Sequence, residues 1–399
     1  MESITQLYKI GLGPSSSHTM GPRRAAVEFI EKTRGAAAGY TVTLYGSLAA
    51  TGKGHLTDKA ILDVMQPVAP TAIAWQPDTF LPYHPNGMKL TAKDADGNVI
   101  LSETVYSIGG GDIVHEGEER STSKSIYPLS TIADILRWCD ESGRSYWEYV
   151  DIHEDPSVWD YLRRVWEVMK SAVERGIEAE GVLPGGLGVR RKAVSYHVHA
   201  AGYNSSLKSR GLLYAYALAV SEENASGGEI VTAPTCGSCG VLPAVLYHLH
   251  TSKGFSEQRI LRALATAGLF GNVVKHNASV SGAEVGCQGE VGVACAMAAA
   301  AASQLFGGTP AQIEYSAEMG LEHHLGLTCD PVCGLVQIPC IERNAYAAAR
   351  ALDANLYSAF SDGRHSVSFD RIVEVMKQTG HDLPSLYKET AQGGLAAIK

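Results

Sequence analysis

The spacing of apolar and polar residues divides the chain into two unlike parts. Up to about residue 120, several segments alternate between apolar and polar positions, which is the two-residue period of a half-buried strand. We expect strands at 41–49, 71–77, 88–94 and 99–111. The pair Asp96-Gly97 predicts a hairpin turn between the last two. One amphipathic helix should begin near Pro22 and end at Gly35, because proline suits a helix start and glycine a helix end.

From Trp159 onward the apolar residues recur every three or four positions, which is the helical period. Strand signals almost vanish there, and the helical segments are rich in alanine and other small residues. These segments are 159–181, 211–228, 256–274, 283–308, 311–326 and 340–360. The sequence therefore predicts an α+β domain over residues 1–125 that is similar to a small-molecule-binding module. A linker over 126–158 and an all-α domain over 159–399 should follow.

Composition narrows the class of protein. The chain has 399 residues, of which 45% are hydrophobic and 19% charged, so it can bury a large core. A formal net charge of −9 disfavours nucleic acid or an anionic membrane as a partner. The first residues lack the basic start and apolar run of a signal peptide, and the apolar run 291–303 is shorter than the roughly 18–20 residues of a membrane span. We therefore expect a cytoplasmic protein.

Cysteine is concentrated in the second half of the chain, where seven of the eight cysteines follow position 230. In a reducing compartment such cysteines act as ligands, reactive thiols or small buried residues rather than as disulfides. Pro331 and Pro339 bracket a non-helical segment from which Cys329 and Cys340 can turn toward one point, and Cys287 lies upstream. Spacing alone leaves two interpretations open, a soft-metal site and three buried structural thiols.

A second pair of cysteines, Cys236-x-x-Cys239, has the spacing of a redox pair or of half a zinc site. No further Cys/His pair at zinc-finger spacing accompanies it, so we interpret both as small residues at a helix start. Glu284 and Glu290 flank Cys287 three residues away on either side. On one helix these three side chains share a face, which predicts a supporting role for the carboxylates.

Polar residues in three loops are further candidates. His18 lies among four hydroxyl residues in GPSSSHT, where a helix-capping cluster is the alternative to a catalytic site. His55, in GKGHLTD, is equally ambiguous when taken alone. Lys275 and Asn277 precede the Cys287 segment and either bind a substrate carboxylate or cap a helix.

Longer motifs decide between these alternatives, because they resemble the motifs of a known protein family. The segments GPSSSHTMGP (13–22), YGSLAATGKGHLTD (45–58), APTCGSCGVLPAVL (233–246), SVSGAEVGCQGEVGVAC (279–295) and LTCDPVCGLVQIPCIERNA (327–345) resemble the iron–sulfur L-serine dehydratases. HPNGM and SIGGGDI lie between them in the same order. The resemblance spans almost the whole chain. It implies an N-terminal α/β domain, a helical catalytic domain and deamination of L-serine to pyruvate and ammonia.

The same resemblance assigns roles to individual residues. It implies a [4Fe–4S] cluster held by Cys287, Cys329 and Cys340, and it makes His55 the expected base for the Cα proton. His18 and the loop Ser16–Thr19 are expected to position the substrate. The candidates for substrate binding are Ser16, Ser17, Thr19, Lys275 and Asn277. Many family members end in a cysteine that caps the open iron. No cysteine follows Cys340 in this sequence, so we expect water or an exogenous ligand there.

The expected partners are therefore a small amino acid and a second copy of the chain, as a homodimer, without nucleic acid or membrane. Three alternatives remain at this point. The enzyme acts mainly on L-threonine or another related amino acid, or it uses pyridoxal phosphate with a Schiff-base lysine, or the chain is a regulator that only binds a metabolite. Iron content and pyruvate formation from serine distinguish them.

Overall fold

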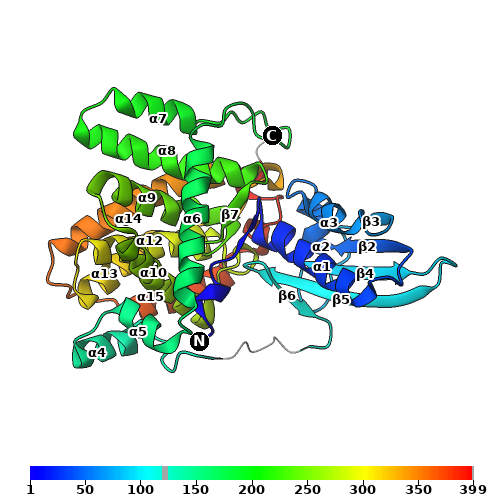
Figure 1. The fold of residues 1–399 in the computed structure, drawn as a ribbon, viewed down its shortest axis with the longest axis horizontal. Helices are drawn as coiled ribbons and strands as arrows, with labels where there is room; N and C mark the ends of the chain where they lie inside the picture. Colours follow the sequence, from blue (N-terminus) through cyan, green and yellow to red (C-terminus); the bar gives the residue numbers. More distant parts are fainter. Residues whose placement is uncertain (119–124, 398–399) are drawn as a thin grey trace.

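A five-stranded sheet lies beside a larger helical part in the computed structural model, which describes residues 1–118 and 125–397 (Figure 1). The predicted fold class, α+β at the N-terminus and mainly helical afterwards, is confirmed. None of the helices in these described residues is both long and apolar enough to cross a membrane.

The sheet has the strand order β3-β2-β4-β5-β6. Its strands are β2 (Gly39–Tyr45), β3 (Thr71–Gln76), β4 (Gly87–Lys93), β5 (Val99–Gly109) and β6 (Asp112–His115). Only β2 and β3 run parallel, and the other neighbours are antiparallel. Alternate residues of β2 are buried, as the two-residue period predicts. Helices α1 (Gly21–Thr33) and α3 (Thr57–Met65) supply Phe29, Ile61 and Met65 to the same core cluster.

Turns in this part follow the sequence closely. The hairpin between β4 and β5 contains Gly97 at φ 85°, and α1 has Pro22 in its first turn with Gly35 just beyond its end. One expectation is wrong in extent, since strand 41–49 stops at Tyr45. Gly46 has φ 49°, and a Cβ there would lie 2.6 Å from the Pro85 carbonyl oxygen. The chain turns at this glycine into a short helix, α2 (Gly46–Thr51).

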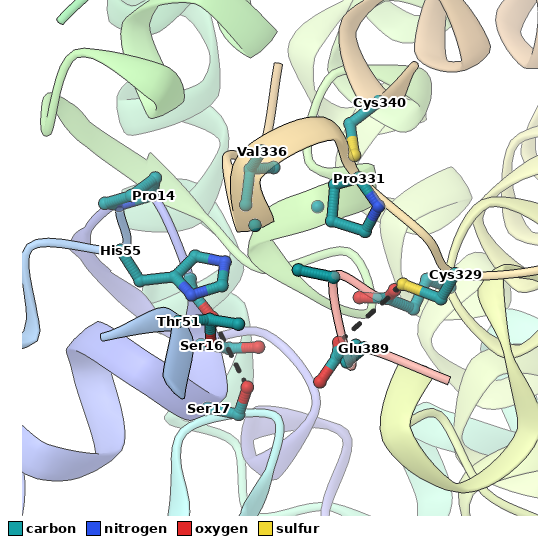
Figure 2. Close-up of a pocket in the computed structure, with 15 residues that line it drawn as sticks. Pro14, Ser16, Ser17, Thr51, His55, Cys329, Pro331, Val336, Cys340 and Glu389 are labelled. Atoms are coloured by element: carbon teal, nitrogen blue, oxygen red, sulfur yellow. Dashed lines mark hydrogen bonds between the residues drawn. The ribbon is translucent and has the colours of Figure 1, made fainter. Parts of the chain in front are cut away.

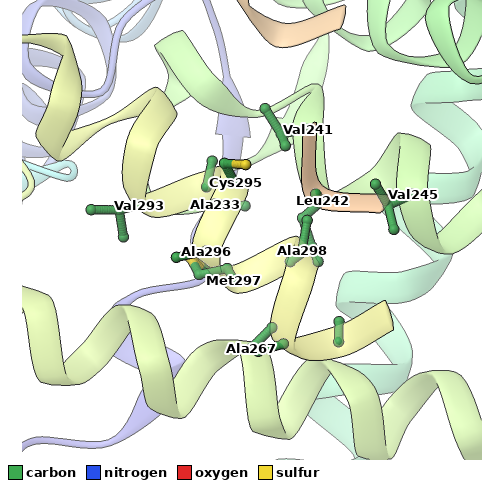
Figure 3. Close-up of a cluster of buried hydrophobic side chains, with 14 of the residues drawn as sticks. Ala233, Val241, Leu242, Val245, Ala267, Val293, Cys295, Ala296, Met297 and Ala298 are labelled. Carbon is green, nitrogen blue, oxygen red and sulfur yellow. The ribbon is translucent and has the colours of Figure 1, made fainter. Parts of the chain in front are cut away.

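Helices fill the rest of the described chain. They are α4 (Ile132–Ser142), α5 (Tyr146–His153), α6 (Val158–Gly176), α7 (Ala193–Ala201), α8 (Ser205–Ala225), α9 (Val241–Lys253), α10 (Glu257–Asn277), α11 (Gly282–Val285), α12 (Val291–Leu305), α13 (Pro310–Glu322), α14 (Cys340–Ala359) and α15 (Phe369–Asp382). The alanine-rich helix α12 is buried almost throughout and packs against α9, α10, α13 and α14. Figure 3 shows its Met297 and Ala298 near Leu242 and Ala267 of α9 and α10. Small side chains permit this close approach of backbones.

The chain begins inside the helical part, not in the sheet. Ile4, Leu7 and Tyr8 belong to the helical core, and β1 (Ile10–Leu12) pairs with β7 (Glu229–Val231). The segment 126–158, expected to be a linker, contains α4 and α5, whose buried side chains join the same core. The expected boundary at residue 125 falls beside 119–124, which lie outside the described residues. The chain therefore passes between the two parts at 13–20 and again after β6.

The predicted helix over 283–308 is wrong at its N-terminal end. Gly286 has φ 75°, the short 3-10 helix η4 (Cys287–Gly289) follows, and Glu290 is kinked before α12 begins. Cys287 therefore lies in a break between helices. Glu284 and Glu290 do not share a helix face with it. The break turns the backbone at Gly286, so Cys287 lies outside a regular α-helix while its side chain stays buried in the helical core.

We expect Gly176→Ala to destabilise the helical part by about 1–3 kcal/mol, because overpacked side chains force neighbouring backbones apart. A Cβ at Gly176 would lie 2.6 Å from the Ala219 carbonyl carbon, where α6 crosses α8. Urea denaturation measures the loss. Gly202→Ala is the control, because a Cβ there meets only the His199 oxygen at 3.5 Å. Equal stability of the two variants would contradict the close approach.

Candidate active site

A cavity lies where the loops of the two parts meet, and we call it the junction cavity (Figure 2). The N-terminal part contributes Pro14, Ser15, Ser16, Ser17, Thr51 and His55. The helical part and the following tail contribute Gly237, Glu290, Cys329, Pro331, Gly334, Val336, Cys340, Glu389 and Ala391. Residues that are more than 300 positions apart in sequence therefore line one space.

Three thiols converge beside this cavity. The ligand atoms of Cys287, Glu290 and Cys329 lie within 4.8 Å of one another, and Cys340 lines the same cavity as Cys329. These cysteines are only 3–7% exposed. Cys287 is presented by the break after α11, and Cys340 is the first residue of α14, directly after Pro339. Buried thiolate with carboxylate nearby is a donor set that fits a soft metal or an iron–sulfur centre.

The pKa values of the three cysteine thiols are shifted in different directions. The pKa of Cys287 is lowered, first by a hydrogen bond with Cys329 and also by the Arg343 guanidinium. The same hydrogen bond, followed by burial, raises the pKa of Cys329, and burial raises that of Cys340. The hydrogen bond thus favours the thiolate form of Cys287 and disfavours that of Cys329. A bound cation is what would allow all three to become thiolates together.

Two histidines meet on the opposite wall. The ring of His55 lines the cavity, and the fully buried ring of His18 lies behind it at a centroid distance of 4.5 Å. Burial lowers the pKa of His18 to about 4, and burial followed by His18 lowers the pKa of His55 well below 6.5. Both rings are therefore neutral at pH 7. The Nδ1 atom of His55 is buried and has no hydrogen-bond partner among the described residues, and the neutral ring lines the cavity.

Hydroxyl groups hold these histidines in place. Ser15 caps the π-helix η2 (Ser16–Met20), and its hydroxyl accepts the His18 amide at 3.1 Å. Thr19 donates its hydroxyl to the His55 carbonyl oxygen at 2.7 Å. Thr57 donates to the His18 carbonyl oxygen at 2.5 Å. The loops at 15–19 and 55–57 are thereby tied to each other, and Thr19 acts on His55 from outside the cavity lining.

Within the predicted set, Ser16 and Ser17 line the cavity, and the Ser17 hydroxyl lies 2.9 Å from His18 Nδ1. Lys275 and Asn277 are not among the lining residues. Lys275 pairs with Glu2 at 2.5 Å and Asp112 at 3.0 Å, which ties α10 to strand β6. The Asn277 amide donates to the Ser130 carbonyl oxygen at 2.7 Å. We do not carry Lys275 and Asn277 into the proposed mechanism.

The Cys236–Cys239 pair is also absent from the lining. Both cysteines are buried, and the Cys236 thiol points to the Met20 sulfur at 3.3 Å. Burial raises the pKa of each thiol, which disfavours reactive thiolates. Packing of small residues accounts for them.

Two acidic residues complete the site. Glu290 accepts a hydrogen bond from Thr235 at 2.7 Å and lies 3.5 Å from the Cys329 sulfur. Glu389 was missed in the sequence, because nothing near it marks a site. Its position is set by backbone pairing, since its amide donates to the Cys329 carbonyl oxygen at 2.7 Å. Burial, followed by Glu290, raises the pKa of Glu389 to about 8.

Fold and site together define a two-part protein with buried thiols and neutral histidines facing one cavity. Comparison with known proteins gives the family. Residues 88–396 match the family described as serine dehydratase alpha chain, and residues 3–72 match the family described as serine dehydratase beta chain. The chain belongs to the serine dehydratase family, with both regions fused in one polypeptide.

Several curated proteins are similar over their full length. An L-serine dehydratase of Streptomyces coelicolor is 43% identical, and the match covers 99% of this chain and 98% of that protein. The L-serine dehydratase TdcG of Escherichia coli is 42% identical over 99% of both chains. An L-serine dehydratase of Haemophilus influenzae is 40% identical over the same shares.

Acid should destabilise the protein through His18. Its folded-state pKa is about 4 against an ordinary value of 6.5, so only the unfolded chain takes up this proton as the pH falls through that window. Stability present at pH 7 should fall by about 2 kcal/mol at pH 5 from this group alone. Urea denaturation between pH 7 and 5 measures the slope. It should be shallower in His18→Gln and unchanged in His381→Gln, whose side chain is 84% exposed. An unaltered slope in His18→Gln would refute the assignment.

Proposed function

We propose that this chain is an L-serine dehydratase that converts L-serine to pyruvate and ammonia in the junction cavity. The observation that carries the proposal is the meeting of Cys329 and Cys340 with the neutral base His55 at one cavity. Loss of water from serine needs both a base for the Cα proton and an acid for the departing hydroxyl. The relatives described above, each named L-serine dehydratase, support the choice of substrate.

The proposed cofactor is a [4Fe–4S] cluster held by Cys287, Cys329 and Cys340. Supporting it are the convergence of thiols and the raised pKa values that only a cation would relieve. Such a cluster, bound through three thiolates, supplies one iron as a Lewis acid for the leaving hydroxyl. We place the enzyme in the cytoplasm, since thiolate ligands need a reducing compartment. The homodimer stays a prediction.

His55 takes the Cα proton in this mechanism, and His18 acts behind it. His18 is held by Ser17 and by Ser47, which lies 3.2 Å from its Nε2. Ser16 and Ser17 offer hydroxyls to the polar groups of the substrate. Removal of the proton and of hydroxide as water leaves aminoacrylate. It rearranges to an imine and hydrolyses to pyruvate and ammonia, with no net oxidation or reduction.

The rival mechanism through pyridoxal phosphate has less support. Its Schiff base requires a lysine at the reacting carbon. No lysine is among the described residues that line the junction cavity. Activity on L-threonine is separated from activity on L-serine by measuring both substrates side by side.

Iron analysis tests the cluster. Anaerobically prepared protein should contain close to four irons and four sulfides per chain, the composition of a [4Fe–4S] cluster. Cys287→Ser, Cys329→Ser and Cys340→Ser should each lose most of the iron, because a hydroxyl is a poor ligand for it. Cys236→Ser is the matched control and should retain the iron. A colourless wild-type enzyme with full activity would exclude the cluster, and an iron-free Cys236→Ser would add that thiol to the ligands.

Kinetics test the base. His55→Ala should keep its iron and still change its visible spectrum when serine is added, because the ligands and the cavity remain. Its kcat should fall by roughly 10²–10⁴, the usual contribution of a general base. The reference for substitution at a distant exposed histidine is His381→Gln, which should turn over as wild type does. Wild-type kcat in His55→Ala would transfer the role to another residue, with His18 next in line.

A further inference from the structure

The tail of the chain forms one wall of the junction cavity. Its backbone pairs with the segment around Cys329, since the Cys329 amide donates to the Tyr387 carbonyl oxygen at 2.9 Å. Asp330 holds the tail a few residues later, where its carboxylate accepts the Leu395 amide at 2.7 Å. These backbone hydrogen bonds therefore hold the tail in place and position the Glu389 side chain at the cavity.

One oxygen atom of the Glu389 side chain is free to form a further hydrogen bond. Its Oε2 atom is buried without a hydrogen-bond partner, and its Oε1 atom lies 3.8 Å from the Cys329 sulfur. Figure 2 shows the side chain between Cys329 and the wall formed by Ser16 and Ser17. A buried carboxylate oxygen that makes no bond is costly unless a ligand completes it.

The other carboxylate at the cavity, Glu290, is already engaged. Thr235 donates to one of its oxygens at 2.7 Å, and Cys329 lies 3.5 Å from the other. No lysine or arginine is among the described lining residues. Arg343, outside the lining, acts on the pKa of Glu290 but is not among the causes of the Glu389 pKa shift. A small amino acid carries one positive group, its α-ammonium. Glu389 has the free oxygen to receive it, and a bound ammonium would offset the burial and the Glu290 charge that raise the pKa of Glu389 to about 8.

Backbone strain points to the same residue. Among the described residues, the non-glycine positions with positive φ are Leu56, Cys333, Glu389 and Ala391. All lie around the cavity, since Leu56 follows His55, Cys333 lies between two cysteine ligands, and Glu389 and Ala391 line it. A left-handed conformation costs a residue with a side chain of order 1 kcal/mol, and such residues persist mainly where function requires the geometry.

We propose that Glu389 binds the α-ammonium group of the substrate in the junction cavity. The inference rests on the proposed function, because it presupposes an amino-acid substrate. It also assigns a task in the reaction. An ammonium held in its charged form beside Cα withdraws electrons and makes the Cα proton easier for His55 to remove. The carboxylate and hydroxyl of the substrate are left to the other groups of the cavity.

The test compares ligands with and without the ammonium on anaerobic holoenzyme. L-serine is the substrate, and 3-hydroxypropanoate, which has the same carboxylate and hydroxyl but no ammonium, is the competitive inhibitor. In Glu389→Gln the KM for L-serine should rise roughly 10–100-fold, the effect of losing a charged hydrogen bond. The Ki of 3-hydroxypropanoate should change less than about 3-fold. Glu389→Asp, which keeps the charge on a shorter arm, should give an intermediate KM.

Controls separate this role from tail packing. Thr390→Ala removes a bond to the Leu386 carbonyl oxygen in the same tail and should leave KM and Ki within about 2-fold of wild type. Iron content and thermal unfolding establish that each variant is folded and loaded. If Glu389→Gln does not fold, Glu389→Asp carries the test, with a raised KM and an unchanged Ki expected.

Several results would overturn the assignment. Parallel losses for L-serine and 3-hydroxypropanoate would mean that Glu389 only supports the tail. An unchanged KM in Glu389→Gln, with a raised KM in Glu290→Gln, would move the ammonium to Glu290. A fall in kcat alone would make Glu389 a base. Failure of the proposed function shows earlier and elsewhere, as absence of pyruvate from L-serine with wild-type enzyme, and would remove the inference with it.

Discussion

Three thiols buried around one small space cannot all lose their protons unless a cation enters, and the rest of the structure is arranged around this constraint. Cys287 lies in the helix break that follows Gly286, and Cys340 is fixed at the start of α14. Arg343, one turn further along α14, lowers the pKa of Cys287 and opposes the rise that burial causes in the pKa of Cys340. The helical part thus holds Cys287, Glu290 and Cys329 in an arrangement that could bind a metal ion.

The second constraint is that the base comes from a different part of the chain. The sheet domain carries His18 and His55 to the cavity on loops at one of its ends. The distance between these histidines and the thiols therefore depends on how the two parts of the chain pack against each other. Asp112 at the start of β6 pairs with Lys275 of α10 and with Lys9. Partly buried ion pairs add little stability but fix orientation when both partners are held. Lys275, which was predicted to bind substrate, forms one of these ion pairs and links α10 to the start of β6.

Much of the fold and part of the candidate site could be predicted from the sequence. Each wrong or missing prediction has a physical cause. Strand alternation, the Asp96-Gly97 turn and the long helices follow local rules, so they were predicted well. The helix break at Gly286 was not, because small residues continue on both sides and glycine is tolerated in helical patterns. The meeting of Cys287 and Cys329 was expected only through resemblance, since convergence of distant segments is a tertiary property. Glu389 left no local signal, because its place is set by backbone pairing with Cys329.

The two walls of the cavity differ in the charges that their side chains carry. Thiols and acidic side chains lie on one wall, where burial raises the pKa of Glu290 and Glu389, while the wall opposite carries histidines that burial keeps neutral. A protonated histidine there would be drawn to the carboxylates and lost as a base. Because burial lowers the pKa of His55, this histidine does not compete as a cation for the acidic side chains opposite. The burial that keeps His55 a neutral base therefore also leaves the free oxygen of Glu389 available to a positive group on a bound ligand.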